Sequence, residues 1–307
     1  VDTKLSKFEV YEDLFPSRSE GVNAWVSIMR GCDKFCTFCI VPFTRGRERS
    51  RPVSSIIKEI KKAVKSGFVE ITLLGQNVNS YTTPNGDFIF LLEEVAKVKG
   101  VERVRYTSPH PKDMNDDLLK VMVKYDNICN YIHLPLQAGS NRILKKMNRT
   151  YTREEFLSLV SMIRTYMPNC SISTDIIVGF PGETEKEYEQ TLDLIKTVQF
   201  DFAYMFKYSS RPGTKASEFT DHIEETVKQE RLSKLIEIQN EIRLNVNKTR
   251  IGSIQKILIE KESKKSELFW SGRTEGNVLT IVKKNNEKVK DIIDVVISDA
   301  QGLTLFG

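Results

Sequence analysis

The sequence lacks the marks of a membrane or secreted protein. Its 307 residues contain no run of 18 apolar residues, so we expect no membrane-spanning helix. The first 20 residues are charged and contain no apolar signal core. The five cysteines are odd in number and are not spaced like a disulfide framework, which argues against an extracellular scaffold. We therefore expect a cytoplasmic protein with reduced thiols and no contact with a membrane.

The sequence also lacks a strong excess of charge, internal repeats and low-complexity tracts. Lysine and arginine number 46 against 41 acidic residues, which gives a net charge of +5. This balance favours a polyanionic partner only weakly. Hydrophobic residues make up 40% and charged residues 28%, as in an ordinary globular protein. At this length, one large domain with a small one is the expected plan.

The central region alternates strand-like apolar runs with amphipathic segments of helical period. The strand candidates span residues 24–30, 69–75, 101–108, 130–136, 171–180 and 201–209. Helices are predicted between them, for example over 53–67, 152–168 and 184–200. Six such units predict an α/β fold, a partial (β/α)6 TIM-like barrel with its chemistry on the loops after the strands.

The C-terminal part has a different period. Residues 221–247 are typical of a long charged helix, and five short strands separated by polar turns follow it. This pattern predicts a small all-β barrel of OB-like type. We therefore expect a linker over 1–20, the barrel with its exit helix over 21–245, and the small β domain over 246–307.

Three of the cysteines, Cys32, Cys36 and Cys39, form a C-x3-C-x2-C pattern just after the first strand. Three thiolates on one loop can hold three corners of an iron–sulfur cluster and leave the fourth iron open for a ligand. A zinc site or plain packing are the alternatives. Zinc would need a fourth ligand, and none of the three histidines has ligand-like spacing to the cluster: His110, His133 and His222.

The cysteine pattern, with Phe38 before the last cysteine, resembles the signature of the radical S-adenosylmethionine (SAM) superfamily. The resemblance implies one [4Fe-4S] cluster on the three cysteines, with Phe38 beside the cofactor SAM. In that superfamily the open iron chelates SAM, and electron transfer cleaves it to a 5′-deoxyadenosyl radical. A partial six-unit barrel is also the superfamily's core fold.

Eight ordered motifs narrow the resemblance to the tRNA-modifying methylthiotransferases. They are "RGCDKFCTFCIVPFTRGRERSRP", "LLGQNVNSY", "TSPHP", "HLPLQAGS", "MNRTYTREEF", "STDIIVGFPGET", "YSSRPGT" and "RTEGN". The resemblance implies a transferase that adds a methylthio group to C2 of N6-isopentenyladenosine 37, beside the anticodon. The C-terminal segment resembles that family's TRAM domain, an RNA-binding module.

Other motifs supply candidate cofactor contacts. Gln76 and Asn77 follow the second strand, where the superfamily binds the methionyl group of SAM. Gly179 and Gly182 follow the fifth strand and would let the backbone approach the adenosyl group. Ordinary turns are the alternative for both pairs.

Four alternating arginines, Arg45, Arg47, Arg49 and Arg51, follow the cysteines directly. At the mouth of the active site they could neutralise the phosphates of a tRNA anticodon stem-loop. A solvated charged loop is the alternative. His110 and His133 are expected to be structural, and Cys129 and Cys170 to be buried packing residues.

The sequence departs from the family at its beginning. Family members carry an additional N-terminal domain whose three cysteines hold a second [4Fe-4S] cluster, and no cysteine precedes Cys32 here. We therefore expect a monomer that takes electrons from a flavodoxin or ferredoxin and cleaves SAM without completing sulfur insertion. Relatives that act on threonylcarbamoyladenosine or a ribosomal protein, and a non-catalytic zinc-bearing RNA-binding protein, are the alternatives.

Overall fold

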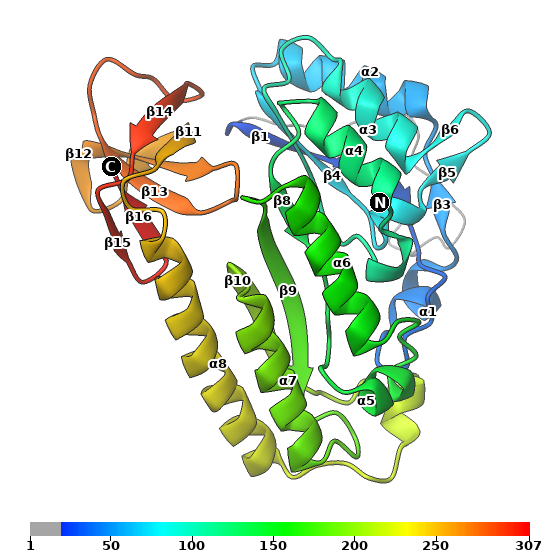
Figure 1. The fold of residues 1–307 in the computed structure, drawn as a ribbon. Helices are drawn as coiled ribbons and strands as arrows, with labels where there is room; N and C mark the ends of the chain where they lie inside the picture. Colours follow the sequence, from blue (N-terminus) through cyan, green and yellow to red (C-terminus); the bar gives the residue numbers. More distant parts are fainter. Residues whose placement is uncertain (1–19) are drawn as a thin grey trace.

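The computed structural model describes residues 20–307, so the predicted linker lies almost wholly outside the described part. Six parallel strands follow one another in sequence order: β1 (Asn23–Ser27), β4 (Glu70–Leu74), β7 (Arg103–Tyr106), β8 (Tyr131–His133), β9 (Ser171–Val178) and β10 (Phe202–Lys207). They form two three-stranded sheets, β1-β4-β7 and β10-β9-β8 (Figure 1). Five of these strands lie within the segments predicted for them, and β1 begins one residue earlier, at Asn23.

Two backbone hydrogen bonds between β7 and the segment before β8 join the two sheets. The amide of Val104 donates to the carbonyl of Asn127 at 2.7 Å, and the amide of Cys129 donates to Val104 at 3.0 Å. The six strands therefore form one continuous open sheet, the barrel wall, with β1 and β10 at its edges. This confirms the predicted partial barrel.

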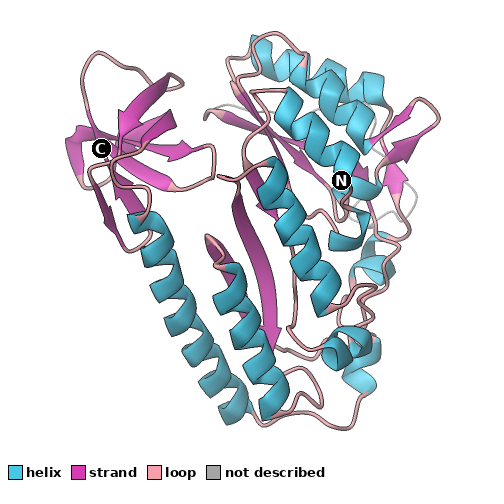
Figure 2. Cartoon of the chain, viewed as in Figure 1, coloured by secondary structure: helices cyan, strands magenta, loops and turns pink. Residues whose placement is uncertain are grey.

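Helices cover the outer side of this wall (Figure 2). The helices before α8 are α1 (Val41–Arg45), α2 (Val53–Lys65), α3 (Phe88–Ala96), α4 (Asp116–Lys124), α5 (Asn141–Lys146), α6 (Arg153–Tyr166) and α7 (Glu185–Val198). Capping boxes begin α6 at Thr152 and α7 at Thr184, so local side-chain bonds fix these starts. No helix in the described part of the chain is long and apolar enough to span a membrane.

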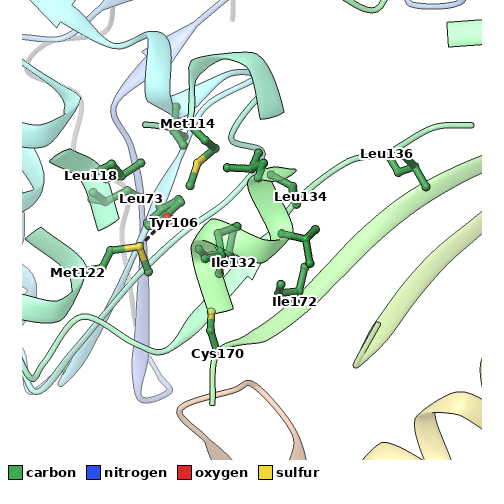
Figure 3. Close-up of a cluster of buried hydrophobic side chains, with 14 of the residues drawn as sticks. Leu73, Tyr106, Met114, Leu118, Met122, Ile132, Leu134, Leu136, Cys170 and Ile172 are labelled. Carbon is green, nitrogen blue, oxygen red and sulfur yellow. Dashed lines mark hydrogen bonds between the residues drawn. The ribbon is translucent and has the colours of Figure 1, made fainter. Parts of the chain in front are cut away.

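The hydrophobic core lies between the wall and its helices (Figure 3). Strand residues such as Leu73, Tyr106 and Ile132 pack there against Leu118 and Met122 of α4. Because strand side chains alternate between faces, the other face points into the barrel. That inner face is largely polar and includes Thr72, Arg105 and Ser173.

The long helix α8 (Glu225–Lys248) leads to the C-terminal domain. Its strands are β11 (Ile254–Ser263), β12 (Ser266–Thr274), β13 (Leu279–Lys283), β14 (Ile292–Val296), β15 (Asp299–Gln301) and β16 (Thr304–Phe306). They form one sheet in the order β14-β11-β12-β13-β16-β15. The prediction of five strands was wrong by one, because residues 291–300 divide into β14 and β15. The amide of Ile297 donates to the carbonyl of Ser253, just before β11, whereas the amide of Ser298 donates to the carbonyl of Phe306 in β16. The chain therefore leaves β11 and pairs with β16 from this point.

Candidate active site

The cysteine loop is closed by a short antiparallel pair, β2 (Met29–Arg30) with β3 (Arg49–Ser50). Gly31 begins the loop at φ +79°, and a Cβ there would lie 2.0 Å from the carbonyl oxygen of Arg47. Only glycine fits this close approach. The next amide, of Cys32, donates to Gly46 at 3.2 Å. The loop therefore holds its first cysteine by backbone contacts.

The three clustered cysteines are free thiols and are half-buried. The amide of Cys39 donates to the carbonyl of Cys36 at 2.9 Å, which turns the chain between them. Burial raises the pKa of Cys32 to about 11 and also raises the pKa of Cys39. Within residues 20–307, no three His, Cys, Asp or Glu side chains are grouped so that they could hold a single metal ion. Three free thiols on one closed loop fit the donor set of an iron–sulfur cluster, in which each thiolate binds a different iron.

A cation that the sequence did not predict lies against this loop. Nη1 of Arg149 lies 3.3 Å from Sγ of Cys36, and Nη2 donates to the carbonyl of Pro135 at 3.2 Å. The guanidinium also stacks on the ring of Tyr151, whose hydroxyl donates to Pro135 and Leu136. The only sequence signal for Arg149 is its place in the "MNRTYTREEF" motif. A fixed cation therefore lies at hydrogen-bond distance from one of the three thiols.

A cavity of about 330 Å³ adjoins the loop at the carboxyl ends of β8, β9 and β10. Its lining consists of Phe38, Cys39, Gln137, Asp175, Ile177, Phe206, Lys207, Tyr208, Ser209 and Arg211. Its volume is at the lower end of the range for small-molecule sites. The cavity also lies at the end of the barrel where βα enzymes carry their chemistry.

Several lining residues went unpredicted although their motifs were recognised. Gln137 has φ +73°, bonds through its backbone to Asp175 and Ile177, and so extends the sheet beyond β8. Asp175 lies in the middle of β9, and Arg211 lies after β10. Nothing in their spacing along the chain indicates that they share one cavity.

The two amides predicted as cofactor contacts lie after β4. Asn77 is buried, donates to Asp113 at 3.0 Å and accepts from the amide of His110 at 3.2 Å. Asp113 in turn pairs with Lys34 of the cysteine loop at 2.6 Å. Asn77 therefore ties the end of β4 to that loop. Oε1 of Gln76 is buried without a hydrogen-bond partner among the described residues, so it is the freer acceptor.

Gly179 and Gly182 lie after β9 with φ values of +68° and +73°. A Cβ at Gly179 would lie 2.2 Å from Cγ of Lys228, and one at Gly182 would lie 2.1 Å from Oδ2 of Asp221. The close approaches that these glycines permit are therefore to α8 and to the segment before it. Neither glycine lines the cavity described above, and their contact with a ligand stays a prediction.

The arginines after the cysteines do not form one exposed row. Arg45 and Arg47 are exposed, and Arg49 is half-buried. Arg47 pairs with Asp33 at 2.7 Å yet keeps 72% of its side chain exposed. Arg51 is only 5% exposed, pairs with Glu59 at 2.7 Å and donates to the carbonyl of Ser27. An RNA contact at Arg51 would break this buried pair, so we correct that prediction.

The two remaining groups have the structural roles expected of them. Cys129 and Cys170 are buried, at 3% and 8% exposure. His110 is buried, and its Nδ1 accepts from the amide of Lys112 at 3.3 Å. Burial and the nearby Arg149 lower the pKa of His110 to about 3, so the ring is neutral at ordinary pH.

Comparison with known proteins identifies the two parts of the chain. The model of the radical SAM superfamily matches residues 26–195, and the TRAM domain model matches residues 248–307. A tRNA-2-methylthio-N(6)-dimethylallyladenosine synthase from Christiangramia forsetii is 46% identical over all of this chain, which covers 68% of that protein. The chain belongs to the radical SAM methylthiotransferase family. Synthases of the same name from Carboxydothermus hydrogenoformans and Parabacteroides distasonis are each 48% identical. The matches cover 98% and 100% of this chain and 69% of each relative.

Solved structures share the fold of this methylthiotransferase at low sequence identity. Coproporphyrinogen III oxidase from Escherichia coli, a radical SAM enzyme, has a TM-score of 0.54 and 13% identity, covering 83% of this chain and 67% of its own. The radical SAM methyltransferase TsrM from Kitasatospora setae has a TM-score of 0.54 and 16% identity, covering 64% and 39%. These likenesses support the barrel architecture.

Proposed function

We propose that this chain carries the SAM-cleaving and RNA-binding parts of a tRNA methylthiotransferase that modifies C2 of N6-isopentenyladenosine beside the anticodon. The observation that carries the proposal is the 46–48% identity to synthases of that name along nearly the whole chain. The family implies a [4Fe-4S] cluster and SAM. When bound together, the two supply a 5′-deoxyadenosyl radical, which removes a hydrogen atom from the substrate.

We assign Cys32, Cys36 and Cys39 as the cluster ligands. Their loop is fixed by β2 and β3, and Arg149 donates to one of the three thiols. A donor to a ligand sulfur stabilises its negative charge and so tunes the bound cluster. No other cysteines than these three form a spaced group in the sequence, so we propose that the chain by itself provides one cluster and SAM cleavage.

The cavity beside Cys39 is the proposed SAM site. SAM carries an ammonium, a carboxylate and a ribose, and the cavity offers a carboxylate, an amide and a guanidinium from Asp175, Gln137 and Arg211. Phe38, Phe206 and Tyr208 supply apolar surface for an adenine ring. Gln76 remains a candidate contact because its buried carbonyl oxygen has no partner among the described residues.

The TRAM domain and the exposed arginines are the proposed RNA-binding parts. Arg45 and Arg47 lie at the cysteine loop, where an RNA loop presenting its base to the radical site would place phosphates. We retain the division into a barrel domain at 21–245 and a TRAM domain at 246–307. We also propose a cytoplasmic monomer that receives electrons from a flavodoxin or ferredoxin.

Isotope transfer tests the proposal. An anticodon stem-loop carrying N6-isopentenyladenosine with deuterium at C2 is incubated with the iron-loaded chain, SAM and a reductant. We expect one deuterium in the 5′-deoxyadenosine that forms. Deuterium transfer from a threonylcarbamoyladenosine stem-loop instead would assign the chain to the other tRNA branch. SAM cleavage without deuterium transfer from either RNA would contradict the tRNA substrate.

A further inference from the structure

The turn between β12 and β13 docks on the amino-terminal end of the barrel, opposite the cysteine loop (Figure 1). Two arginines of β7 reach it, Arg103 at 2% and Arg105 at 7% exposure. Arg103 donates to the carbonyls of Arg273 and Lys256, both at 2.8 Å. Arg105 donates to the two carbonyls that follow Arg273, those of residues 274 and 275, at 2.9 and 2.7 Å. Four backbone carbonyls of the TRAM domain are thus bound by guanidinium groups from the barrel.

The fit at this end is close. A Cβ on Gly276 would lie 2.2 Å from Oγ of Ser171, at the start of β9. Arg250, just after α8, donates to the same Oγ at 3.1 Å and also bonds to Asp201. Residues 273–277, the "RTEGN" motif, therefore close the amino-terminal end of the barrel, which we call its floor. If the TRAM domain moved away, Arg103 would lose both of its carbonyl acceptors and Arg105 would keep only its pair with Glu70 at 3.0 Å.

A continuous polar chain runs from this floor to the cavity at the other end. The guanidinium of Arg105 lies 5.8 Å from the ring centre of Tyr131. The hydroxyl of Tyr131 bonds to Oγ of Ser173 at 2.7 Å, and that Oγ bonds to Nδ1 of His133 at 2.9 Å. Nε2 of His133 lies 3.3 Å from Oδ2 of Asp175, which lines the cavity. Alternate residues of β8 and β9 supply these groups, so all of them face the barrel interior.

We propose that the TRAM domain has a second role besides RNA binding: it forms the floor of the catalytic barrel and, through Tyr131 and His133, holds the Asp175 carboxylate in its place in the cavity. Tyr131 and His133 are positioning residues, since neither lines the cavity. The inference rests on the proposed function, because it takes this cavity as the SAM site. It follows that SAM binding depends on the docked TRAM domain even when no RNA is present.

The test measures the iron-loaded full chain without RNA. Tyr131→Phe and His133→Gln each break the polar chain, and Gly276→Val displaces the floor segment. Tyr166→Phe is the matched control, because it also removes a bonded hydroxyl but lies on α6, outside the barrel interior. Gly302→Asn is the control in the TRAM domain, because asparagine tolerates the φ of +52° and a Cβ there meets nothing within 4 Å.

We expect Tyr131→Phe and His133→Gln to raise the Kd for SAM by about three- to tenfold, the range for one lost hydrogen bond. We expect their Kd for an anticodon stem-loop and their melting temperatures to stay close to those of the unaltered chain. Because the two residues act in one chain, the double variant should lose no more SAM affinity than the worse single variant. Gly276→Val should weaken SAM binding as well, and the controls should not.

An unchanged SAM Kd in Tyr131→Phe and His133→Gln would overturn the inference while the proposed function stands. Additive losses in the double variant would also overturn it, because independent sites add. If Gly276→Val fails to fold, the Kd values of Tyr131→Phe and His133→Gln for SAM still test the inference. If the unaltered chain itself binds no SAM, the proposed function fails first.

Discussion

Nη1 of Arg149 lies 3.3 Å from Sγ of Cys36, although the two residues are 113 positions apart. Its other bonds go to the backbone of Pro135 and to the hydroxyl of Tyr151, so contacts within the protein fix the guanidinium. A permanent cation at hydrogen-bond distance from Cys36 would bond to a ligand sulfur of the proposed cluster. The relationship links the cysteine loop to the segment that follows α5.

The first prediction concerns this contact. In Arg149→Gln the donor to Cys36 loses its charge, so a reduced cluster is less stabilised and its midpoint potential should become more negative. SAM cleavage should slow by about tenfold, as for other residues that support metal ligands. Redox titration followed by electron paramagnetic resonance measures the potential. Lys145→Gln, on the exposed side of α5, is the control and should leave the potential unchanged.

A second prediction separates the exposed arginines from the buried one. Arg47→Gln should weaken binding of an anticodon stem-loop and reduce the slope of log Kd against log salt by about 0.7–0.9, the effect of one lost phosphate contact. Its free energy of unfolding should change little, since its pair with Asp33 is exposed. Equal salt slopes for the variant and the unaltered chain would remove Arg47 from the RNA site.

Arg51→Gln should behave in the opposite way. Removing it breaks the buried ion pair between Arg51 and Glu59, which costs about 3–5 kcal/mol of stability. The salt slope of RNA binding by the folded fraction should not change. Urea unfolding measures the first quantity and fluorescence anisotropy the second.

His110 should make the stability of the cluster-free chain depend on pH. Its pKa is lowered to about 3 in the folded state, whereas the unfolded chain has the ordinary value near 6.5. Between these values only the unfolded chain takes up the proton, so the free energy of unfolding falls as the pH falls below about 6.5. The His110 share of this loss is about 1 kcal/mol at pH 5.5.

Urea unfolding at pH 7.5 and 5.5 checks this prediction with His110→Asn as the comparison. The asparagine oxygen can still accept from the amide of Lys112, which His110 does in the structure. The unaltered chain should lose about 1 kcal/mol more stability between the two pH values than the variant. Equal losses would show that His110 is not held neutral by its surroundings.

The helix starts and the strands could be predicted from the sequence because they depend on residues close together in the chain. Thr152 and Thr184 mark two helix starts because a capping box involves only four successive residues. The six strands were found because apolar runs of that length are local too. Phe38 lines the cavity, and its expected contact with the cofactor stays a prediction.

What the sequence could not supply depends on contacts between distant residues. Arg149 and Cys36, or Arg105 and the TRAM turn, meet only because the barrel closes, and no spacing rule expresses that. The same reason explains the error at Arg51: it continues the alternating pattern of its exposed neighbours, yet it pairs with the buried Glu59 of α2. The division between β14 and β15 depends on the different hydrogen-bond partners of Ile297 and Ser298, which are Ser253 and Phe306.

The measurement that tests the central claim most directly is iron and 5′-deoxyadenosine after anaerobic reconstitution with iron and sulfide, compared for the unaltered chain, Cys36→Ala and Cys170→Ala. We predict about four irons for each chain and 5′-deoxyadenosine from SAM in the unaltered protein and in Cys170→Ala. Both should be lost in Cys36→Ala, because we assign the cluster to the cysteine loop, whereas Cys170 is buried away from it among packing residues. Bound zinc without 5′-deoxyadenosine, or full activity in Cys36→Ala, would contradict the account.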